Sequence, residues 1–336
     1  MGLTLLLVLL IVFLRFKLRR DLRRERDFVD LWRPLLLDAV SQAHSDDPPR
    51  ALPELRTRDH VLFLKLWVYL QESLRGSANN RLNELARRLG CEASVHHFLR
   101  HGKRAERLLA ILALGHLRDP SAWDELSQQA RWRDSLVSIH AARAIIRIDP
   151  LQATELLLPL LLARTDWGIA QVAGFLAEVR PAFGLRLTQN LLKVKRECWL
   201  RALQLTDALR LELPVQSMRF ILEQSPSVET LVAALHLASS LHLLPAVRPY
   251  MDHPDWRVRV EAARFLSRFG DEQDIASLER LLKDAQWWVR YQAAQALVQM
   301  PFYGRQALQA LCTTTVDALA RDMLRHVLAE HETVPV

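Results

Sequence analysis

Apolar side chains recur at helical spacing through most of the chain, and the same pattern is written more than once. In residues 255–271 the apolar positions lie three and four residues apart, which places them on one stripe of a helix: Val258, Ala262, Phe265, Leu266 and Phe269. Residues 286–302 repeat this pattern 31 positions later, and residues 133–150 carry it upstream. A helix that recurs at a fixed interval predicts a chain built from stacked repeats.

Prolines mark the same period independently. They stand 30 to 33 residues apart: Pro120, Pro150, Pro181, Pro214 and Pro245. Proline is tolerated in the first turn of a helix but not in its interior, so each one predicts the start of a helix. Asp119 and Asp149 directly precede two of them and are typical N-cap residues. About thirty residues hold two helices, and such a pair must bury its apolar face against its neighbours.

The Trp, Val-Arg and Ala-Ala positions of the second helix, with an Asp-Pro or Gly-Asp start to the first, resemble HEAT-like repeats of the phycobilisome-lyase type. The resemblance covers roughly residues 105–332; it is strong at 119–149 and 255–302 and thin at 182–245. It implies an all-α fold, an α-solenoid of stacked helix pairs whose usual role is to bind protein. It implies no lyase chemistry.

Composition agrees with a helical chain. Only 10 of 336 residues are glycine, and no alternating Val/Ile/Thr runs with Asn-Gly turns predict a sheet. The three cysteines, Cys91, Cys198 and Cys312, are far apart and include no C-x-x-C pair. Disulfide scaffolds and zinc fingers are therefore not expected, and a reducing compartment fits best.

The first residues predict a single apolar anchor helix ahead of the repeats. Residues 2–14 are uncharged and almost wholly apolar, although about 20 Å of helix is short of a hydrocarbon core of about 30 Å. Basic residues follow this run instead of preceding it, unlike in a secretory signal. They are Arg15, Lys17, Arg19, Arg20, Arg23, Arg24 and Arg26.

This order predicts a membrane anchor at residues 1–18 and a basic juxtamembrane segment at 19–27 that contacts anionic lipid head groups. The positive-inside rule then predicts a single-pass protein of the cell inner membrane, with its N-terminus outside and its repeats in the cytoplasm. The alternative is a buried or interfacial leader helix. Residues 28–104 predict helices whose spacing differs from that of the repeats, and we expect them to form an N-terminal cap. Repeats at 105–332 and a tail at 333–336 follow.

The net charge of +7 invites a nucleic-acid interpretation. Residues 15–27 hold seven basic and three acidic side chains, so most of the excess lies beside the predicted anchor. We therefore expect no nucleic acid among the partners. A soluble nucleic-acid-binding repeat protein remains the alternative function.

Candidate chemistry is sparse. The chain contains no phosphate-binding loop, dinucleotide fingerprint or nucleophile elbow. His97 and His101 are spaced like a metal pair on one helical face, with His96 next to them, but no third ligand is visible nearby. We expect no enzyme, metal, cofactor or small-molecule substrate, and a metal-dependent repeat enzyme is the weaker alternative.

Two sets of side chains are candidates for partner binding. One set occupies equivalent positions, off the apolar stripe of the second helix, in three repeats: Arg143, Arg147, Arg264, Arg268, Gln295 and Gln299. The other comprises tryptophans near the turn between helices, which either plug that turn or form an exposed aromatic edge: Trp132, Trp167, Trp256 and Trp287. A merely solvated face is the alternative for the first set. Arg259 and Arg290 are expected to pair with acidic residues such as Asp255 or Asp284 and to brace the stack.

These observations together predict a membrane-tethered, cytoplasm-facing HEAT-repeat scaffold or adaptor that binds another protein. The partner is expected to be membrane-associated, in a bacterial envelope complex containing, for example, a glycosyltransferase or a transporter.

Overall fold

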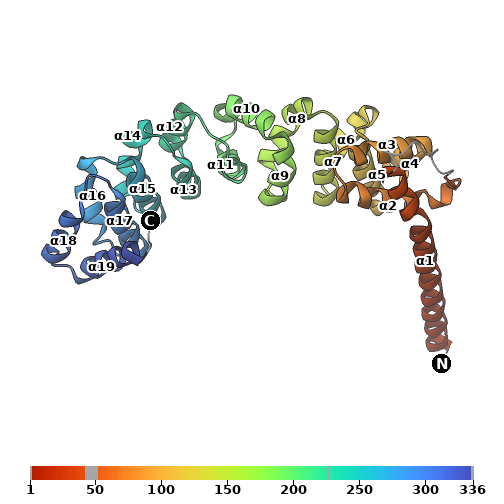
Figure 1. Ribbon diagram of the computed structural model, residues 1–336, viewed down its shortest axis with the longest axis horizontal. Coiled ribbons are helices and arrows are strands. Elements are labelled where there is room, and N and C mark those ends of the chain that lie inside the picture. The colour runs from red at the N-terminus through yellow and green to blue at the C-terminus, as the bar shows by residue number, and fades with distance from the viewer. Residues whose placement is uncertain (1, 42–51, 226, 334–336) are drawn as a thin grey trace. The chain divides into compact units, whose positions relative to one another are not determined.

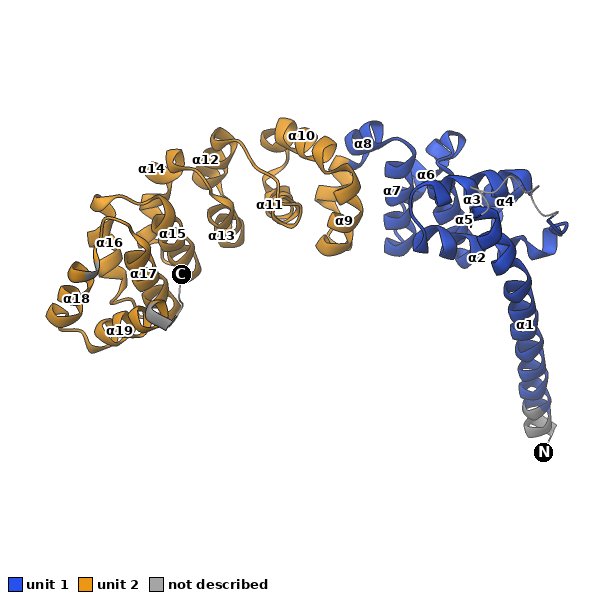
Figure 2. Ribbon diagram, viewed as in Figure 1, with its two compact units in different colours: residues 1–157 blue, residues 158–336 orange. Residues whose placement is uncertain are grey.

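The computed structural model describes residues 2–41, 52–225 and 227–333, which form helices and no strands (Figure 1). The all-α fold class predicted from the sequence is thereby confirmed. The helices belong to two compact units, residues 1–157 and residues 158–336 (Figure 2). Each unit is built from consecutive helices that pack on one another, an arrangement consistent with an α-solenoid.

Unit 1 packs around its central helices. Its elements are α1 (Gly2–Ser41), α2 (His60–Ser73), α3 (Ser77–Arg88), α4 (Cys91–His101), α5 (Arg104–Leu117), α6 (Trp123–Ala130), α7 (Ser135–Ile148) and the first part of α8 (Pro150–Ala163), with short 3₁₀ turns at Thr57–Asp59 and Pro120–Ala122. Helix α5 contacts α2, α4 and α7. Phe63 and Trp67 of α2 and Leu114 of α5 are fully buried in this core.

Unit 2 continues with shorter helices and more 3₁₀ turns. Its α-helices after α8 are α9 (Ile169–Leu176), α10 (Arg180–Asn190), α11 (Trp199–Ala208), α12 (Val215–Gln224), α13 (Val228–Leu237), α14 (Leu244–Val247), α15 (Trp256–Phe269), α16 (Ile275–Leu281), α17 (Trp287–Gln299), α18 (Arg305–Thr314) and α19 (Ala318–Thr333). The 3₁₀ helices in this unit are Ala177–Val179, Leu191–Lys193, Arg196–Cys198, Leu241–Leu243, Arg248–Asp252 and Glu272–Asp274.

The second helices of the repeats in unit 2 pack in chain order. Helix α11 contacts α13, α13 contacts α15, α15 contacts α17 and α17 contacts α19. The paired alanines of the repeat pattern lie in these contacts and are fully buried: Ala262, Ala263, Ala293 and Ala294. Small side chains let two helices approach closely, and the buried apolar stripe then stabilises each helix through its neighbours.

The prolines and capping residues define the helix starts, as the sequence predicts. Pro150 is the first residue of α8, Pro181 and Pro245 lie in the first turns of α10 and α14, and Pro214 is the N-cap of α12. The Asp119 carboxylate accepts a hydrogen bond from the Ser121 amide, ahead of the 3₁₀ helix that begins at Pro120. These caps satisfy amide groups that the helices cannot pair themselves.

Helix α1 docks only through its C-terminal part. Trp32 and Leu36 are buried, and the Trp32 ring meets Phe63 of α2 edge-on, with ring centroids 5.4 Å apart. The apolar side chains described in the N-terminal part of α1 are exposed, Leu9 by 61%. This helix therefore shows an apolar surface that no other described residue covers.

The predicted membrane anchor over residues 1–18 is wrong. Across the described residues, no helix is both long enough and apolar enough to cross a membrane. The reason lies in α1, whose apolar run from Gly2 ends at Leu14, after about 20 Å of helix against a hydrocarbon core of about 30 Å. Arg15 and Lys17 follow at once. The predicted location, a single-pass protein of the inner membrane with cytoplasmic repeats, depended on this anchor and is therefore wrong as well.

Helix α1 runs without a break through the predicted boundaries after residues 18 and 27. The division into a cap at 28–104 and repeats at 105–332 stays a prediction. Residues 42–51 of that cap and residues 334–336 of the predicted tail lie outside the described residues. All three cysteines are free, as expected for thiols so far apart.

Two helical glycines provide a matched test of the packing. A Cβ added at Gly115 of α5 would lie 2.9 Å from Cα and Cβ of Ala144 on α7, whereas a Cβ at Gly174 of α9 would meet nothing within 4 Å. We expect Gly115→Ala to destabilise unit 1 by about 1–3 kcal/mol through overpacking. Gly174→Ala should stabilise unit 2 by about 0.5–1 kcal/mol through helix propensity. Denaturant unfolding followed by circular dichroism measures both, and equal effects of the two substitutions would contradict the close approach of α5 and α7.

Candidate functional site

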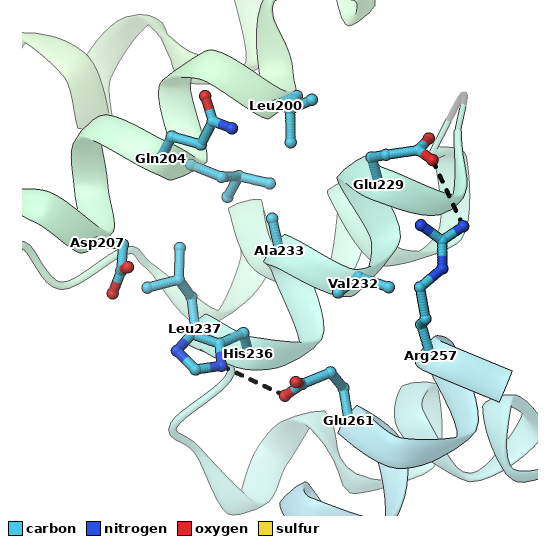
Figure 3. Close-up of a pocket in the computed structure, with 11 residues that line it drawn as sticks. Leu200, Gln204, Asp207, Glu229, Val232, Ala233, His236, Leu237, Arg257 and Glu261 are labelled. Atoms are coloured by element: carbon cyan, nitrogen blue, oxygen red, sulfur yellow. Dashed lines mark hydrogen bonds and ion pairs between the residues drawn. The ribbon is translucent and has the colours of Figure 1, made fainter. Parts of the chain in front are cut away.

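Three successive second helices in unit 2 line a groove of about 350 Å³ (Figure 3). Its apolar wall consists of Leu200 and Leu203 from α11 and Val232, Ala233 and Leu237 from α13. Figure 3 shows Val232 and Ala233 of α13 in the middle of the groove, with α11 on one side and α15 on the other. An apolar wall formed by several helices is typical of a surface that receives a side chain of a ligand or partner.

The spacing of residues on α13 explains why this helix can both build the core and line the groove. The groove-lining residues of α13 are spaced three or four positions apart along the chain, or are adjacent, so they share one face of the helix: Glu229, Val232, Ala233 and His236. Thr230, Leu231, Ala234 and Leu235 lie on the opposite face and are buried: none is more than 6% exposed. The groove-lining face is less buried: Val232, Ala233 and Leu237 are half-buried, and Glu229 and His236 are exposed.

A small side chain at one position opens the groove. Counted from the N-cap residue of each second helix, the sixth position is a long polar residue on α7, α11, α15 and α17, namely His140, Gln204, Glu261 and Gln292. It is small on α9 and α13, where Gly174 and Ala233 stand. A larger side chain there would fill the space between α11 and α15. This site was not predicted from the sequence, although an alignment of the second helices on their N-caps shows a small residue at this position on α9 and α13.

Polar and charged side chains form the rim of the groove (Figure 3). The Arg257 guanidinium lies 3.5 Å from the Glu229 carboxylate and is held more closely by Asp255, at 2.8 Å. On the same helix as Arg257, the Glu261 carboxylate lies 3.3 Å from His236 Nδ1. The hydrogen bond from Arg257, against some loss of hydration, lowers the pKa of Asp255 to about 2. The rim is therefore ionic and its arginine is already engaged.

The arginines predicted to bind a partner are also engaged on α15. Arg264 donates to Glu261 at 2.7 Å, and its side chain is 40% exposed. Arg268 donates to the carbonyl oxygen of Ala238 at the C-terminal end of α13, at 3.1 Å, and its guanidinium lies over the Phe269 ring. Burial, with Arg264 close by, lowers the pKa of Arg268. Arg268 thus braces α13, while Arg264 pairs with Glu261, which lines the groove.

The equivalent arginines of α7 show the same division in unit 1. Arg143 lies 3.9 Å from Glu72 of α2. Arg147 points to the last turn of α5, where its Nη1 lies 3.1 Å from His116 Nε2. Burial, with Arg147 and Arg143 next to the ring, lowers the pKa of His116 to about 3, so the ring is neutral and accepts from the guanidinium. Arg147, like Arg268, holds the end of the preceding second helix.

The glutamines of α17 form a network with α19 instead. Gln295 Nε2 donates to the Tyr291 hydroxyl at 3.0 Å and to the Glu330 carboxylate at 3.1 Å. Gln299 donates to Gln295 at 3.4 Å. Within each unit, the predicted residues therefore contact neighbouring helices and not one another alone.

The predicted tryptophans divide into one plug and three exposed rings. Trp167 is fully buried, with the Arg164 guanidinium 5.0 Å from its ring centre, whereas Trp132, Trp256 and Trp287 are 48%, 36% and 43% exposed. Trp288 is 57% exposed and was not predicted as a candidate from the sequence. The adjacent Trp-Trp pair, where other repeats carry one tryptophan, was the available signal.

An aromatic cluster on α17 adjoins this network. Trp287 stacks on Tyr291 with ring centroids 5.1 Å apart, and Trp288 meets both rings edge-on. The exposed Trp287 and Trp288 rings of this cluster therefore lie on the solvent-facing side of α17.

Comparison with known proteins adds the family. A family model described as HEAT repeats matches residues 221–298 and 244–329, which include α13, α15, α17 and most of α19. Residues 221–329 of the chain therefore contain HEAT-like helical repeats. The match does not show whether these repeats are of the phycobilisome-lyase type. The groove lies partly within this HEAT-like region, because α13 and α15 are included and α11 precedes it.

One solved structure similar to this chain is a crystal structure of an engineered protein. It is 17% identical, with 90% of this chain and 89% of that chain covered, at a TM-score of 0.38. This score establishes no shared fold, so the assignment of the HEAT-like repeats rests on the family match. A search of the curated proteins found no match.

The histidines singled out as a metal pair have other surroundings. His97 and His101 do lie together, with ring centroids 5.1 Å apart, but the described part of the chain has no group of three or more His, Cys, Asp or Glu that could hold a metal ion. His96 Nε2 lies 2.8 Å from Asp119 and 3.3 Å from the Ser121 hydroxyl. A catalytic triad needs its serine and its carboxylate on opposite ring nitrogens. Here the carboxylate and the hydroxyl both face the same nitrogen, His96 Nε2, and these contacts link α4 to the turn before α6.

The basic residues predicted to meet a membrane surface lie along the exposed part of α1: Arg15, Lys17, Arg19, Arg20, Arg23 and Arg24. Arg24 forms an ion pair with Asp59 ahead of α2, and Glu25 pairs with Lys65 at 3.2 Å. Their predicted contact with anionic lipid head groups depended on the membrane anchor and has no support without it.

The environment of His116 predicts an acid-sensitive unit 1. The unfolded chain binds a proton at this imidazole below about pH 6.5, whereas the folded chain does so only below about pH 3. Protonation therefore favours unfolding, and stability is lost as the pH falls from about 6.5 towards 3. Between pH 7 and pH 5 the loss is about 2 kcal/mol, measured by denaturant unfolding of the wild type. The same drop in a folded His116→Gln variant would show that another group is responsible.

Proposed function

We propose that this HEAT-like repeat protein is a scaffold or adaptor that binds another protein through the groove lined by α11, α13 and α15. The observation that carries the proposal is the groove itself, with an apolar wall from two helices and a charged rim. HEAT repeats generally mediate protein–protein interaction, which supports a protein as the ligand. Apolar anchors in a pocket supply most of the affinity of such interfaces, and a polar rim supplies orientation.

The predicted partner-binding residues enter this proposal with two different roles. Arg264 is partly exposed and pairs with Glu261, which lines the groove, and it contacts the partner directly. Gln295 and Gln299 extend the contact onto α17. Arg268 acts through the helix end that it braces. In unit 1, Arg143 and Arg147 are proposed as a separate contact with the same division: Arg143 meets the partner and Arg147 positions α5.

Nucleic acid is a poor ligand for this groove. Three carboxylates, from Asp207, Glu229 and Glu261, line it together with a single arginine, Arg257. A phosphate backbone is bound by unopposed lysine and arginine side chains, so acidic residues at the site disfavour it. The envelope-associated partner expected from the sequence depended on the membrane anchor, and the proposal names no complex.

Filling the groove tests the proposal. Ala233→Trp places a large side chain on the less buried face of α13, so it should remove the binding of the protein partner while leaving helicity and the melting temperature nearly unchanged. Leu185→Trp on α10 is the matched control, because this residue is 60% exposed on a first helix away from the groove. Partners are compared by affinity purification with quantitative mass spectrometry. Identical partner recovery with the two variants and the wild type would exclude the groove as the binding site.

A further inference from the structure

We infer that the groove takes a helical segment of a partner protein in which one apolar side chain is flanked on both sides, about one turn away, by lysine or arginine. This inference rests on the proposed function and adds the chemistry of the partner. A groove of about 350 Å³ lies at the small end of ligand pockets, which range over roughly 300–1,000 Å³. It therefore suits one or two apolar side chains.

Negative charge lies at both ends of the groove. Glu229 stands in the first turn of α13, whereas Asp207 stands in the last turn of α11, beside His236 and Leu237 at the other end of α13 (Figure 3). Val232 and Ala233 lie between the two carboxylates. Glu229 to Leu237 spans about 12 Å of helix, which is also the reach of two side chains placed four residues before and after a central anchor.

The carboxylate of Asp207 is the less compensated of the two. It lies at the C-terminal end of α11, where the helix macrodipole adds further negative potential. The side chain is exposed and makes no hydrogen bond or ion pair with the described residues. A partner cation placed here would meet both the carboxylate and the helix end, which makes a lysine or arginine the complementary group.

Glu229 is only loosely held by the protein itself. Its ion pair with Arg257 is 3.5 Å long and its side chain is 55% exposed, while Arg257 makes a shorter contact with Asp255 at 2.8 Å. A partner cation can therefore approach Glu229 without depriving Arg257 of its main carboxylate. Glu261, by contrast, is engaged by Arg264 and is 12% exposed, so it contributes background charge more than a contact.

Three otherwise identical helical peptides test the inference: each has a central leucine, flanked four residues away on both sides by lysine, glutamine or glutamate. Their affinities for the full chain are measured by fluorescence anisotropy. The wild type should bind the lysine peptide roughly 2- to 20-fold more tightly than the glutamine peptide, because two exposed ion pairs change affinity by about this factor. The glutamate peptide should bind most weakly, and added salt should reduce the differences.

Charge variants then separate the inference from the proposed function. The double variant Asp207→Lys and Glu229→Lys should reverse the order of the three peptides, whereas Glu212→Lys with Glu223→Lys, an equal charge change outside the groove, should keep it. Binding that Ala233→Trp abolishes but that shows no preference for lysine overturns the inference and leaves the groove as a binding site. Binding that survives Ala233→Trp overturns both, and failure of all three peptides to bind overturns the inference.

Discussion

The close approach of consecutive second helices is the constraint on which this structure depends. A repeat of about thirty residues cannot bury its apolar stripe alone, so each second helix is stable only against the next one. The chain meets this requirement with small side chains, Gly115 against Ala144 in unit 1 and the buried pairs that begin at Ala262 and Ala293 in unit 2. Larger residues here would separate the helices and expose the apolar stripe to water.

Arginines make this stacking specific by linking each repeat to its neighbour. Arg259 donates two hydrogen bonds, 2.7 and 2.9 Å long, to the Asp284 carboxylate in the turn before α17. Arg201 is buried and donates to the carbonyl oxygens of Leu161 and Trp167 in the preceding repeat. Leaving such groups unpaired in the interior would be costly, so these bonds favour one alignment of the repeats over others. Arg147 and Arg268 are used in the same way: each guanidinium is bound to the end of the preceding second helix, so it is less available to a partner.

The repeat pattern was predictable because it reflects the core. Val258, Ala262 and Leu266 recur at helical spacing since the next helix covers them, and Pro150 or Asp119 marks a helix start through its own backbone chemistry. The braces were predictable only in part. Arg259 pairs with Asp284, as expected, but Arg290 donates to the backbone oxygens of Asp284 and Ala285. Such a partner leaves no mark in the side-chain sequence.

The anchor was mispredicted for a related reason. Composition shows that residues 2–14 are apolar, but crossing a membrane depends on an uninterrupted length that the basic residues from Arg15 onward deny. The groove was not predicted because it depends on the absence of a long side chain: α13 has Ala233 where the neighbouring helices α11 and α15 have Gln204 and Glu261. An apolar residue beside a buried one reads as core until the N-cap fixes which face it occupies.

The separation of two faces on α13 connects the fold to the proposed function. Leu231, Ala234 and Leu235 contribute to the core, so they determine whether the repeat stacks. Glu229 and Ala233 lie on the other face, where a substitution alters the shape or charge of the groove with little effect on that core. In a HEAT-like protein the face of each second helix can thus differ from repeat to repeat while the core pattern stays the same. The groove lies where that face carries Ala233, and its charge is set by the carboxylates around it. Under the proposed function, the residues that select a partner therefore differ from the buried residues that stack the repeats.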